Sequence, residues 1–421
     1  MKRYLVYLTF LLLVSESSLC SHMAYAGGTK SKSAYYEKLA RQIISLCHRH
    51  MYKTPKSIAM LRPNVTRTLL AKVSRVKSDS AFARVINDHL HSAGLSHTHL
   101  FRPSDDEFYL LRAFINPAVA KMWPIWHFGM LVRSYGGKYI VRGVLEGFSA
   151  ERAGVLRGDV LLEVNGKPFH PRYSFQSSKP STLLVIRNGK RIAFRVTPVL
   201  SSLYEAMKQA TRNSIKTWEF LGFRMGYIHL WALGEQSMIR FFQKHFLNLS
   251  QNLDGLILDL RGGFGGSTMG YRNFFYKNNR TYYQTTFVRS KVPYRARTFS
   301  PEKMGFDSFR AFTGPLVVLI DSSTRSAKEA LAFQFRKDGR AKLLGQKTKG
   351  ALCPTWFYLR DNPRFFLMLP IGELLLDGKT VEGKGVSPDV LLKQPFVGRL
   401  STNEGLLFSS AFLVSELLGL E

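Results

Sequence analysis

Apolar positions recur at three- and four-residue spacing through much of residues 33–112. The stretches YYEKLARQIISLC and SAFARVINDHLHSAGL show this spacing most clearly. It places apolar side chains along one face of a helix, so the pattern predicts a helical N-terminal domain over this range. The domain ends in LSHTHLFRPSDDEFYLL, which is polar and turn-like in its middle.

From about residue 127 the pattern changes to short β-type runs that are broken by glycines. RGDVLLEVNGKPF predicts a strand, an Asn-Gly turn and a second short strand, because Asn-Gly suits the tight turn of a β-hairpin. We therefore expect a separate β-domain over residues 125–199.

The segment from about 220 to 395 alternates between strands and amphipathic helices. The strands are MGYIHLWAL, GLILDLR and PLVVLID, and the helices are SMIRFFQKHFLNLSQNL and SAKEALAFQFRK. Such alternation predicts βαβ units and a largely parallel sheet. Functional sites in these sheets gather at the carboxyl ends of the strands, where Gly263 and Ser326 both lie.

Together these patterns predict an α+β multidomain protein. We expect the helical segment and the β-domain to be followed by an α/β core at 205–395 and a helical tail at 396–421. A chain of 421 residues is long enough for two or three domains. Its hydrophobic content of 45% and aromatic content of 13% are typical of a folded globular protein.

The first residues have the pattern of an export signal. MKRY is basic, LVYLTFLLLV is apolar, and AYA at 24–26 carries small residues where signal peptidases cut. We therefore expect residues 1–26 to be a signal peptide, since the apolar run is too short to span a bilayer comfortably. An exported protein would be periplasmic or secreted. Cys47 and Cys353 could pair in an oxidising compartment.

Charge narrows the function only slightly. The chain has 60 Lys and Arg against 29 Asp and Glu, a formal net charge of +31. The excess is spread along the chain, and neither zinc-finger spacing nor an aromatic–basic RNA-binding motif accompanies it, so we expect no nucleic-acid partner. A basic surface would suit association with an anionic envelope or membrane surface.

Ser326 follows a predicted buried strand and begins a predicted helix. A serine there can cap the helix. The same position exposes the hydroxyl and places the N–H groups of the helix next to a developing oxyanion. Ser322 and Ser323 lie nearby as alternatives. The glycines of DLRGGFGGS at 259–267 would let the backbone approach a substrate closely, although the pattern is no P-loop.

Five motifs carry a family resemblance. GYIHLWAL, LDGLILDLRGGFGGS, PLVVLIDSSTRSAKEALAF, GQKTKG and VEGKGVSPDV occur in the order seen in C-terminal processing (tail-specific) serine peptidases and in the catalytic core of tricorn protease. With the segments that precede them, the resemblance covers about residues 35–395. It implies a ClpP/crotonase-like core and hydrolysis through an acyl-enzyme, without a metal or organic cofactor.

Carried over residue by residue, the resemblance makes Ser326 the nucleophile. The backbone N–H of Ala327 would supply one oxyanion donor, and Gly263 or its neighbour Gly265 the other. The lysine that serves processing peptidases as general base falls on Ala351, and a methyl group cannot accept a proton.

Two other lysines lie close to that position in the sequence. Lys347 and Lys349 belong to a charged loop that we expect to be exposed. A lysine there stays protonated and is a poor base. The usual Ser–Lys dyad is therefore excluded.

The histidine-using branch of the family offers another base. LSHTHLF resembles the Ser-His-Thr segment of that branch and places the base on His97, while Glu382 matches the acidic residue of the E-G-x-G-V-x-P-D segment. A histidine has a suitable pKa, and a carboxylate fixes its tautomer. His99 remains an alternative base, and Glu382 could instead act as a cap or pair with Lys384.

Two further interpretations of these residues are open. Both histidines could be structural. A His-X-His pair also invites a metal, but no third ligand stands at a telling spacing, so we expect none. Asp389, at a turn after proline, is expected to be structural.

The β-domain resembles a PDZ domain of bacterial proteases. HFGM would be its carboxylate-binding loop, with Phe128, Gly129 and Met130 receiving the peptide, and SAERAGVLRGDVLLEVNG would be the following helix, turn and strand. The resemblance implies that an extended polypeptide, bound through its C-terminus, adds a strand to the sheet.

The favoured interpretation is an exported serine peptidase with a PDZ domain. A catalytically inactive PDZ-containing scaffold protein of the cell envelope is the main alternative, because the usual lysine is missing. A protein that binds small apolar molecules is a weaker one, since some relatives with this core bind retinoids.

Overall fold

The computed structural model describes residues 29–115, 124–234, 236–268, 270–277, 283–287, 294–295, 311–392, 410, 414 and 416. The predicted signal peptide at 1–26 lies outside these residues, as does nearly all of the predicted tail at 396–421. Among the described helices, none has both the length and the apolar character needed to cross a membrane.

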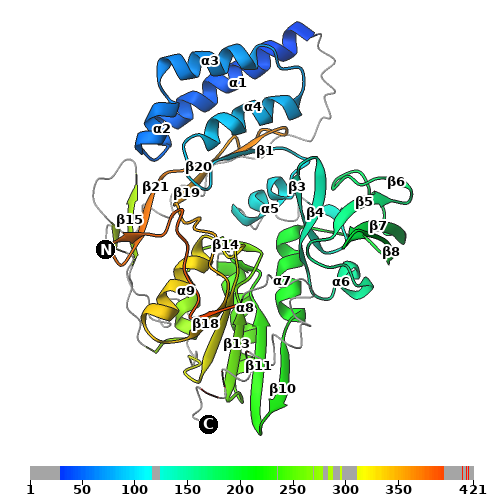
Figure 1. The fold of residues 1–421 in the computed structure, drawn as a ribbon, viewed down its shortest axis with the longest axis vertical. Helices are drawn as coiled ribbons and strands as arrows, with labels where there is room; N and C mark the ends of the chain where they lie inside the picture. The colour runs from blue at the N-terminus through cyan, green and yellow to red at the C-terminus, as the bar shows by residue number, and fades with distance from the viewer. Residues whose placement is uncertain are drawn as a thin grey trace, which may run out of the picture.

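The N-terminal helices form a layer of their own at the top of Figure 1. They are α1 (Thr29–His50), α2 (Pro55–Met60), α3 (Pro63–Val73) and α4 (Asp79–His91). Helices thus form where the apolar spacing predicts them. Their shared core contains Phe82 of α4, and it is completed by Phe365 and Leu367 from much later in the chain. The helical layer is therefore built partly from the C-terminal half of the protein.

A small sheet joins a segment near residue 100 to strands from the C-terminal half of the chain. It has the order β1 (His99–Phe101), β20 (Phe366–Pro370) and β19 (Thr355–Tyr358). β1 runs antiparallel to β20, with His99 opposite Met368. Helix α5 (Asp106–Ile115) follows β1. The pairing of β1 with β20 brings the LSHTHLF segment to the core, although the two are far apart in sequence.

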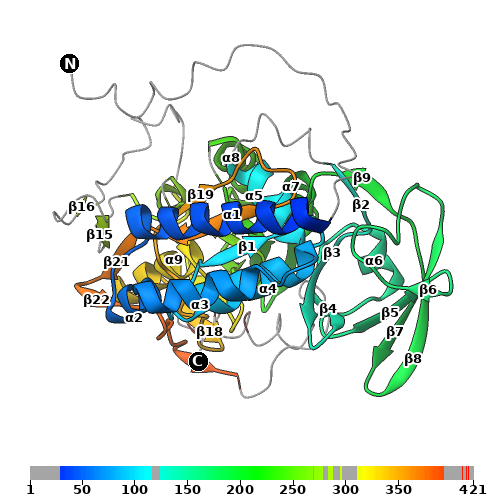
Figure 2. The same ribbon diagram turned by 90° about the horizontal axis from the view of Figure 1, so that it is seen from above.

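The β-domain stands to one side of the helical layer (Figure 2). Its sheet contains β3 (Met130–Tyr135), β4 (Lys138–Val144), β5 (Val160–Val164), β6 (Lys167–Pro168), β7 (Ser181–Arg187) and β8 (Lys190–Val196). A short helix, α6 (Ser149–Ala153), lies between β4 and β5, and β2 (Ile125–His127) pairs with β9 (Val199–Ser201). The Asn165–Gly166 turn links β5 and β6 with positive φ at both residues, as the sequence predicts.

The core contains the predicted parallel sheet. Its order is β10 (Lys216–Phe220), β11 (Phe223–His229), β13 (Gly255–Asp259), β17 (Leu316–Ile320), β18 (Lys342–Gly345) and β23 (Val390–Leu391). Every neighbouring pair is parallel except β10 and β11. The associated helices are α7 (Leu203–Asn213), α8 (Gln236–Ser250) and α9 (Ala327–Lys337). The fully buried strands β13 and β17 match the apolar runs that predict them.

Smaller elements surround the carboxyl ends of these strands. β12 (Ala232–Leu233) pairs with β14 (Phe264–Gly266), and a 3-10 helix spans Tyr271–Phe274. A second antiparallel sheet has the order β16 (Tyr294–Arg295), β15 (Tyr283–Phe287), β21 (Gly372–Leu376) and β22 (Lys379–Thr380). The glycine-rich segment and the start of α9 therefore lie at one end of the parallel sheet.

Candidate active site

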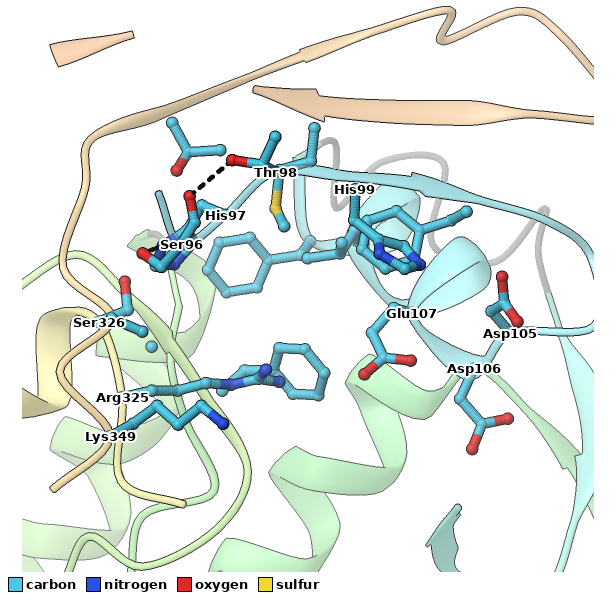
Figure 3. Close-up of a pocket in the computed structure, with 18 of the residues that line it drawn as sticks. Ser96, His97, Thr98, His99, Asp105, Asp106, Glu107, Arg325, Ser326 and Lys349 are labelled. Carbon is cyan, nitrogen blue, oxygen red and sulfur yellow. Dashed lines mark hydrogen bonds between the residues drawn. The ribbon is translucent and has the colours of Figure 1, made fainter. Parts of the chain in front are cut away.

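A cavity of about 2340 Å³ opens where the helical layer, the β-domain and the core meet. Its walls include His97 ahead of β1, Arg142 of β4 and Ser326 at the start of α9. Small-molecule sites rarely exceed roughly 1,000 Å³, so this space suits a stretch of polypeptide better. Figure 3 shows Ser96 and His97 above Ser326, with His99 displaced toward Glu107.

Ser326 stands at a strained turn between β17 and α9. Its backbone has φ 58° and ψ −132°, a conformation that residues other than glycine rarely adopt. Strain of this kind costs on the order of 1–3 kcal/mol and persists only where the surroundings impose it. Here the Ser326 N–H donates to the carbonyl of Ala351 at 2.8 Å and to Glu329 Oε2 at 3.1 Å. The turn exposes the hydroxyl of Ser326 to the cavity.

Glu329 ties the Ser326 turn to the loop that carries Ala351. Its Oε1 accepts from Thr348 Oγ1 and from the Gly350 N–H, both at 2.6 Å, and its Oε2 accepts from the Ala351 N–H at 2.7 Å. Burial raises the pKa of Glu329, and these hydrogen bonds oppose the rise. Ala351 is thereby held beside Ser326, so the position of the missing lysine is close to the hydroxyl in space as well as in the motif.

The glycine-rich segment lies against the same serine. A Cβ on Gly265 would come within 2.4 Å of Ser326 Cβ and 2.9 Å of the Ala327 nitrogen. Only glycine therefore allows this approach. A Cβ on Gly263, in contrast, would meet the Trp231 carbonyl oxygen at 1.9 Å. Of the two glycines that the sequence singles out, Gly265 is the one that borders Ser326 and lines the cavity.

His97 is connected to Glu382 through Ser96. Ser96 Oγ lies 2.8 Å from His97 Nδ1 and donates to Glu382 Oε2 at 3.0 Å. The Ser96 N–H donates to Glu382 Oε1 at 2.6 Å, and the Leu352 N–H donates to Oε2 at 2.7 Å. Because the Ser96 hydroxyl gives its proton to the carboxylate, its oxygen accepts from His97 Nδ1–H, which leaves Nε2 unprotonated.

The sequence reasoning missed Ser96. It identified Glu382 as the direct partner of the histidine, whereas the structure places a hydroxyl between them. The available signal was the serine of the quoted Ser-His-Thr segment. Glu382 forms no ion pair with Lys384 among the described residues; its carboxylate instead accepts from the backbone N–H groups of Ser96 and Leu352, as the capping alternative expects.

The two histidines of the segment have different surroundings. The pKa of His97 is lowered to about 4, because burial and, to a smaller extent, Arg325 lower it by more than Glu382 raises it. Burial likewise lowers the pKa of His99 to about 4. The ring nitrogens of His99, however, lie 3.3 Å from His91 Nε2 and 3.3 Å from Asn87 Nδ2, on the helical layer.

The remaining candidate ligands do not converge. Across the part of the chain that the structure describes, no three His, Cys, Asp or Glu side chains form a group that could hold a metal ion. Asp389 accepts from Arg336 Nε and from the Leu343 N–H, each at 2.8 Å, which is a structural role as expected.

Residues 224–392 match the family model described as peptidase family S41. The chain carries a peptidase family S41 domain. This S41 domain runs from β11 to just beyond β23 and contains Ser326 and Glu382. Ser96 and His97 precede it, so the candidate site combines residues of the N-terminal region with Ser326 and Glu382 of the S41 domain.

Named relatives agree with the S41 assignment. The carboxy-terminal processing protease CtpA of Bacillus subtilis is 25% identical over 287 residues, covering 65% of this chain and 57% of that protein. The chloroplastic carboxyl-terminal-processing peptidase 1 of Arabidopsis thaliana is 26% identical over 339 residues, covering 75% and 63%. The matches thus span about three fifths of these relatives. The photosystem II D1 C-terminal processing protease shares the fold, with a TM-score of 0.54 at 18% identity over 85% of this chain and 93% of that one.

The β-domain reaches the Ser326 turn of the S41 domain through an ion pair. Arg157 binds Asp321 at the end of β17. Asp321 also accepts from the N–H groups of Ser323 and Thr324, each at 2.9 Å. Burial raises the pKa of Asp321, but Arg157, Ser323 and Arg261 together outweigh it and the net shift is downward. The residues just before Ser326 are thus held from the β-domain.

A second contact reaches the glycine-rich segment of the S41 domain. Glu146, from the loop after β4, binds His229 Nδ1 at 2.9 Å and Trp231 Nε1 at 2.5 Å in a buried position. The Trp231 carbonyl then accepts from the Phe264 N–H at 2.8 Å. Lys328 of α9 contacts the same segment. Its buried ammonium donates to the carbonyl of Gly262 at 3.0 Å, and burial lowers its pKa to about 7.

The predicted carboxylate-binding loop of the β-domain is largely enclosed. Phe128 and Met130 are buried, and the Gly129 N–H donates to His127 Nδ1 at 3.0 Å. On the adjoining strand β3, the Val132 N–H donates to Asp106 Oδ2 of α5 at 3.1 Å. A peptide that adds to this edge would have to displace Asp106.

Both cysteines that the structure describes are free. Cys47 is buried in the core of the helical layer, and Cys353 is buried in the cavity wall. The disulfide that the sequence left open is not formed. Burial raises the pKa of Cys47 to about 12, which makes this thiol unreactive.

Proposed function

We propose that this chain is a serine peptidase with Ser326 as nucleophile and His97 as general base. The observation that carries the proposal is the hydrogen-bonded series Glu382–Ser96–His97, which ends in the cavity beside Ser326. Ala351 supports the same assignment, because no lysine occupies the position from which processing peptidases take their base.

The geometry supports a definite proton path. Ser326 Oγ attacks the peptide carbonyl carbon while His97 Nε2 takes its proton. The resulting imidazolium is stabilised by Ser96, whose hydroxyl is oriented by the Glu382 carboxylate. His97 then returns the proton to the leaving amine as the C–N bond breaks. Water, activated by the same histidine, hydrolyses the acyl-enzyme.

Two backbone N–H groups are suited to hold the oxyanion. That of Ala327 lies at the N-terminus of α9, where the helix dipole favours negative charge. The second comes from the glycine-rich segment. Gly265 is better placed than Gly263, since it borders Ser326 whereas Gly263 packs against Trp231.

The substrate in this proposal is a polypeptide. The size of the cavity supports an extended chain, and the named relatives are processing proteases that act at carboxyl termini. We include in the proposal that the β-domain is a PDZ domain, whose loop at Phe128, Gly129 and Met130 receives the substrate tail once Asp106 has moved away from the edge of β3. We also include that residues 1–26 direct export to the periplasm or beyond.

Covalent labelling by a fluorophosphonate tests the proposal, because the reagent reacts with activated serines. Wild type should be labelled, and Ser326→Ala should not, whereas Ser323→Ala should keep the label. A digest of a peptide library should give cleavage with wild type and with Ser323→Ala, but not with Ser326→Ala. Folded wild type that neither labels nor cleaves would support the inactive scaffold of the cell envelope.

A further inference from the structure

The residue immediately before the nucleophile is a cation that faces the cavity. Arg325 lines the cavity, and its guanidinium lies 4.4 Å from the centre of the Phe264 ring. Its Nη2 is buried, and among the described residues it has no hydrogen-bond partner. Burial of an unpaired donor on a charged group is unfavourable, so such an atom marks a place where an acceptor is missing.

Further cations surround Arg325. Arg133, Arg142 and Lys349 also line the cavity. Burial lowers the pKa of Arg325 to about 10, and Arg142 adds to this decrease. Lys349 is an exposed residue at the rim, and partial desolvation lowers its pKa, with contributions from Arg133 and Arg325. These groups therefore repel one another across the empty space.

The carboxylates of the cavity wall offset this charge only in part: Glu107 raises the pKa of Arg325, but burial, Arg142 and Arg133 lower it, and the net shift is downward. Three adjacent acids line it, and within the described residues each is bound to an arginine other than Arg325. The pairs are Asp105–Arg102, Asp106–Arg172 and Glu107–Arg142. Figure 3 shows the side chains of Arg325 and Lys349 extending in the same direction from the Ser326 side, toward Glu107. An anion that enters between Ser326 and Glu107 would meet both.

We propose that Arg325, with Lys349, forms a subsite that binds a carboxylate of the substrate next to the scissile bond. The inference rests on the proposed peptidase function and adds a substrate class to it. The planar guanidinium matches the two oxygens of a carboxylate, and the ammonium of Lys349 adds a point charge.

The subsite lies close to the scissile bond. Arg325 adjoins Ser326 in the chain, and an extended peptide advances about 3.3 Å per residue, so the carboxylate belongs within two or three residues of the bond. It has two chemical sources, an Asp or Glu side chain or the free C-terminus of the substrate. In the second case the enzyme would remove short C-terminal pieces.

Matched peptides test the subsite through an internal ratio. One set consists of paired pools of peptides of about ten residues with amidated C-termini. The two pools of a pair differ only in having Asp or Asn at a defined position, and each pair tests a different position. A parallel set without acidic residues has a free or an amidated C-terminus. Wild type should prefer the carboxylate member of one pair by about tenfold in kcat/KM, which corresponds to about 1.4 kcal/mol. The pair that shows the preference identifies the source.

The variants are compared by that ratio, so a general loss of activity cancels. Arg325→Gln should bring the ratio close to one, and Arg325→Lys should restore part of it. Lys349→Gln should lower it by less. Lys347→Gln is the matched control, because this exposed lysine is two residues away and does not line the cavity, and it should keep the wild-type ratio.

Binding to the Ser326→Ala protein separates this proposal from the peptidase proposal. Fluorescent versions of the same pairs should bind more tightly when they carry the carboxylate, and Ser326→Ala with Arg325→Gln should lose the difference. If the carboxylate peptides bind more tightly but wild type cleaves none of the peptides, the subsite proposal stands and the peptidase proposal is refuted. Cleavage and binding without preference in any pair would refute the subsite and leave the peptidase standing.

Discussion

Only Thr98 separates His97 from His99 in the sequence, yet the two histidines belong to different parts of the structure. His97 has φ 57° and sits in a bend that faces the S41 domain. His99 begins β1 and is bound by Asn87 and His91 of the helical layer. Burial lowers the pKa of both to about 4, so titration alone does not distinguish them. Their hydrogen-bond partners do.

The difference indicates which of the two histidines suits the role of the proposed base. The nitrogens of His99 are both engaged by neighbours with no link to Ser326. Among the residues that the structure describes, His97 is held at one nitrogen only, by a serine that a carboxylate orients. A catalytic histidine needs this asymmetry, since one nitrogen must fix the tautomer while the other exchanges a proton.

Replacing each histidine separately by alanine should give the largest difference between His97 and His99. His97→Ala should slow fluorophosphonate labelling by roughly a thousandfold or more, because the nucleophile loses its base. His99→Ala should slow it by less than about tenfold, since only the positioning of the segment is affected. A larger loss in His99→Ala than in His97→Ala, with both proteins folded, would move the base to His99.

The Ser96 link gives the next largest effect. Ser96→Ala and Glu382→Gln should each reduce labelling by about a hundredfold, because the tautomer and the charge of His97 lose their support. Ser96→Thr should recover part of the rate, which a purely structural role would not require. Lys384→Gln serves as the control for Glu382 and should behave as wild type. Equal rates for Ser96→Ala and wild type would remove the serine from the mechanism.

The pH profile sharpens the comparison further. His97 acts as a base only when neutral, and its pKa is about 4, so labelling should persist as pH falls through 6 and should decline near 4. Arg325 lowers that pKa, hence Arg325→Gln should move the decline to higher pH. His99→Gln should leave the profile in place. A decline near 6.5 in wild type, the usual value for histidine, would contradict the assignment.

Stability should reveal the role of His99 with the smallest effect. His99→Ala should lower the free energy of unfolding by about 1 kcal/mol, through lost hydrogen bonds to the helical layer. The pKa of His99 is lower in the folded protein, so its contribution is present above the unfolded pKa of about 6.5 and is lost as pH falls toward 4. Urea unfolding should therefore depend less on pH in the variant than in wild type.

Local patterns in the sequence predicted most elements of the fold. The fully apolar runs at β13 and β17, the Asn165–Gly166 turn and the helices of the first hundred residues all follow from spacing and turn chemistry. The pairing of β1 with β20 did not, because register between distant segments depends on packing that no local pattern records.

The site was predictable to the same limit. Ser326, His97 and Glu382 came from motifs, and the structure brings the first two into one cavity. The place of Ser96 between His97 and Glu382 required coordinates, because a serine beside a histidine has many possible partners. So did the buried Nη2 of Arg325, which has no hydrogen-bond partner within the described ranges and which sequence cannot separate from an exposed cation.

The hydrogen bond between Ser96 and Glu382 also bears on biosynthesis. A nascent chain synthesised only as far as Ser326 would contain the proposed nucleophile and histidine. It would still lack β20 and the Glu382 carboxylate that orients the histidine through Ser96. The peptidase proposed above would thus stay latent through most of its own translation. It would become active only after Glu382 had left the ribosome and the segment that carries it had packed against the N-terminal region.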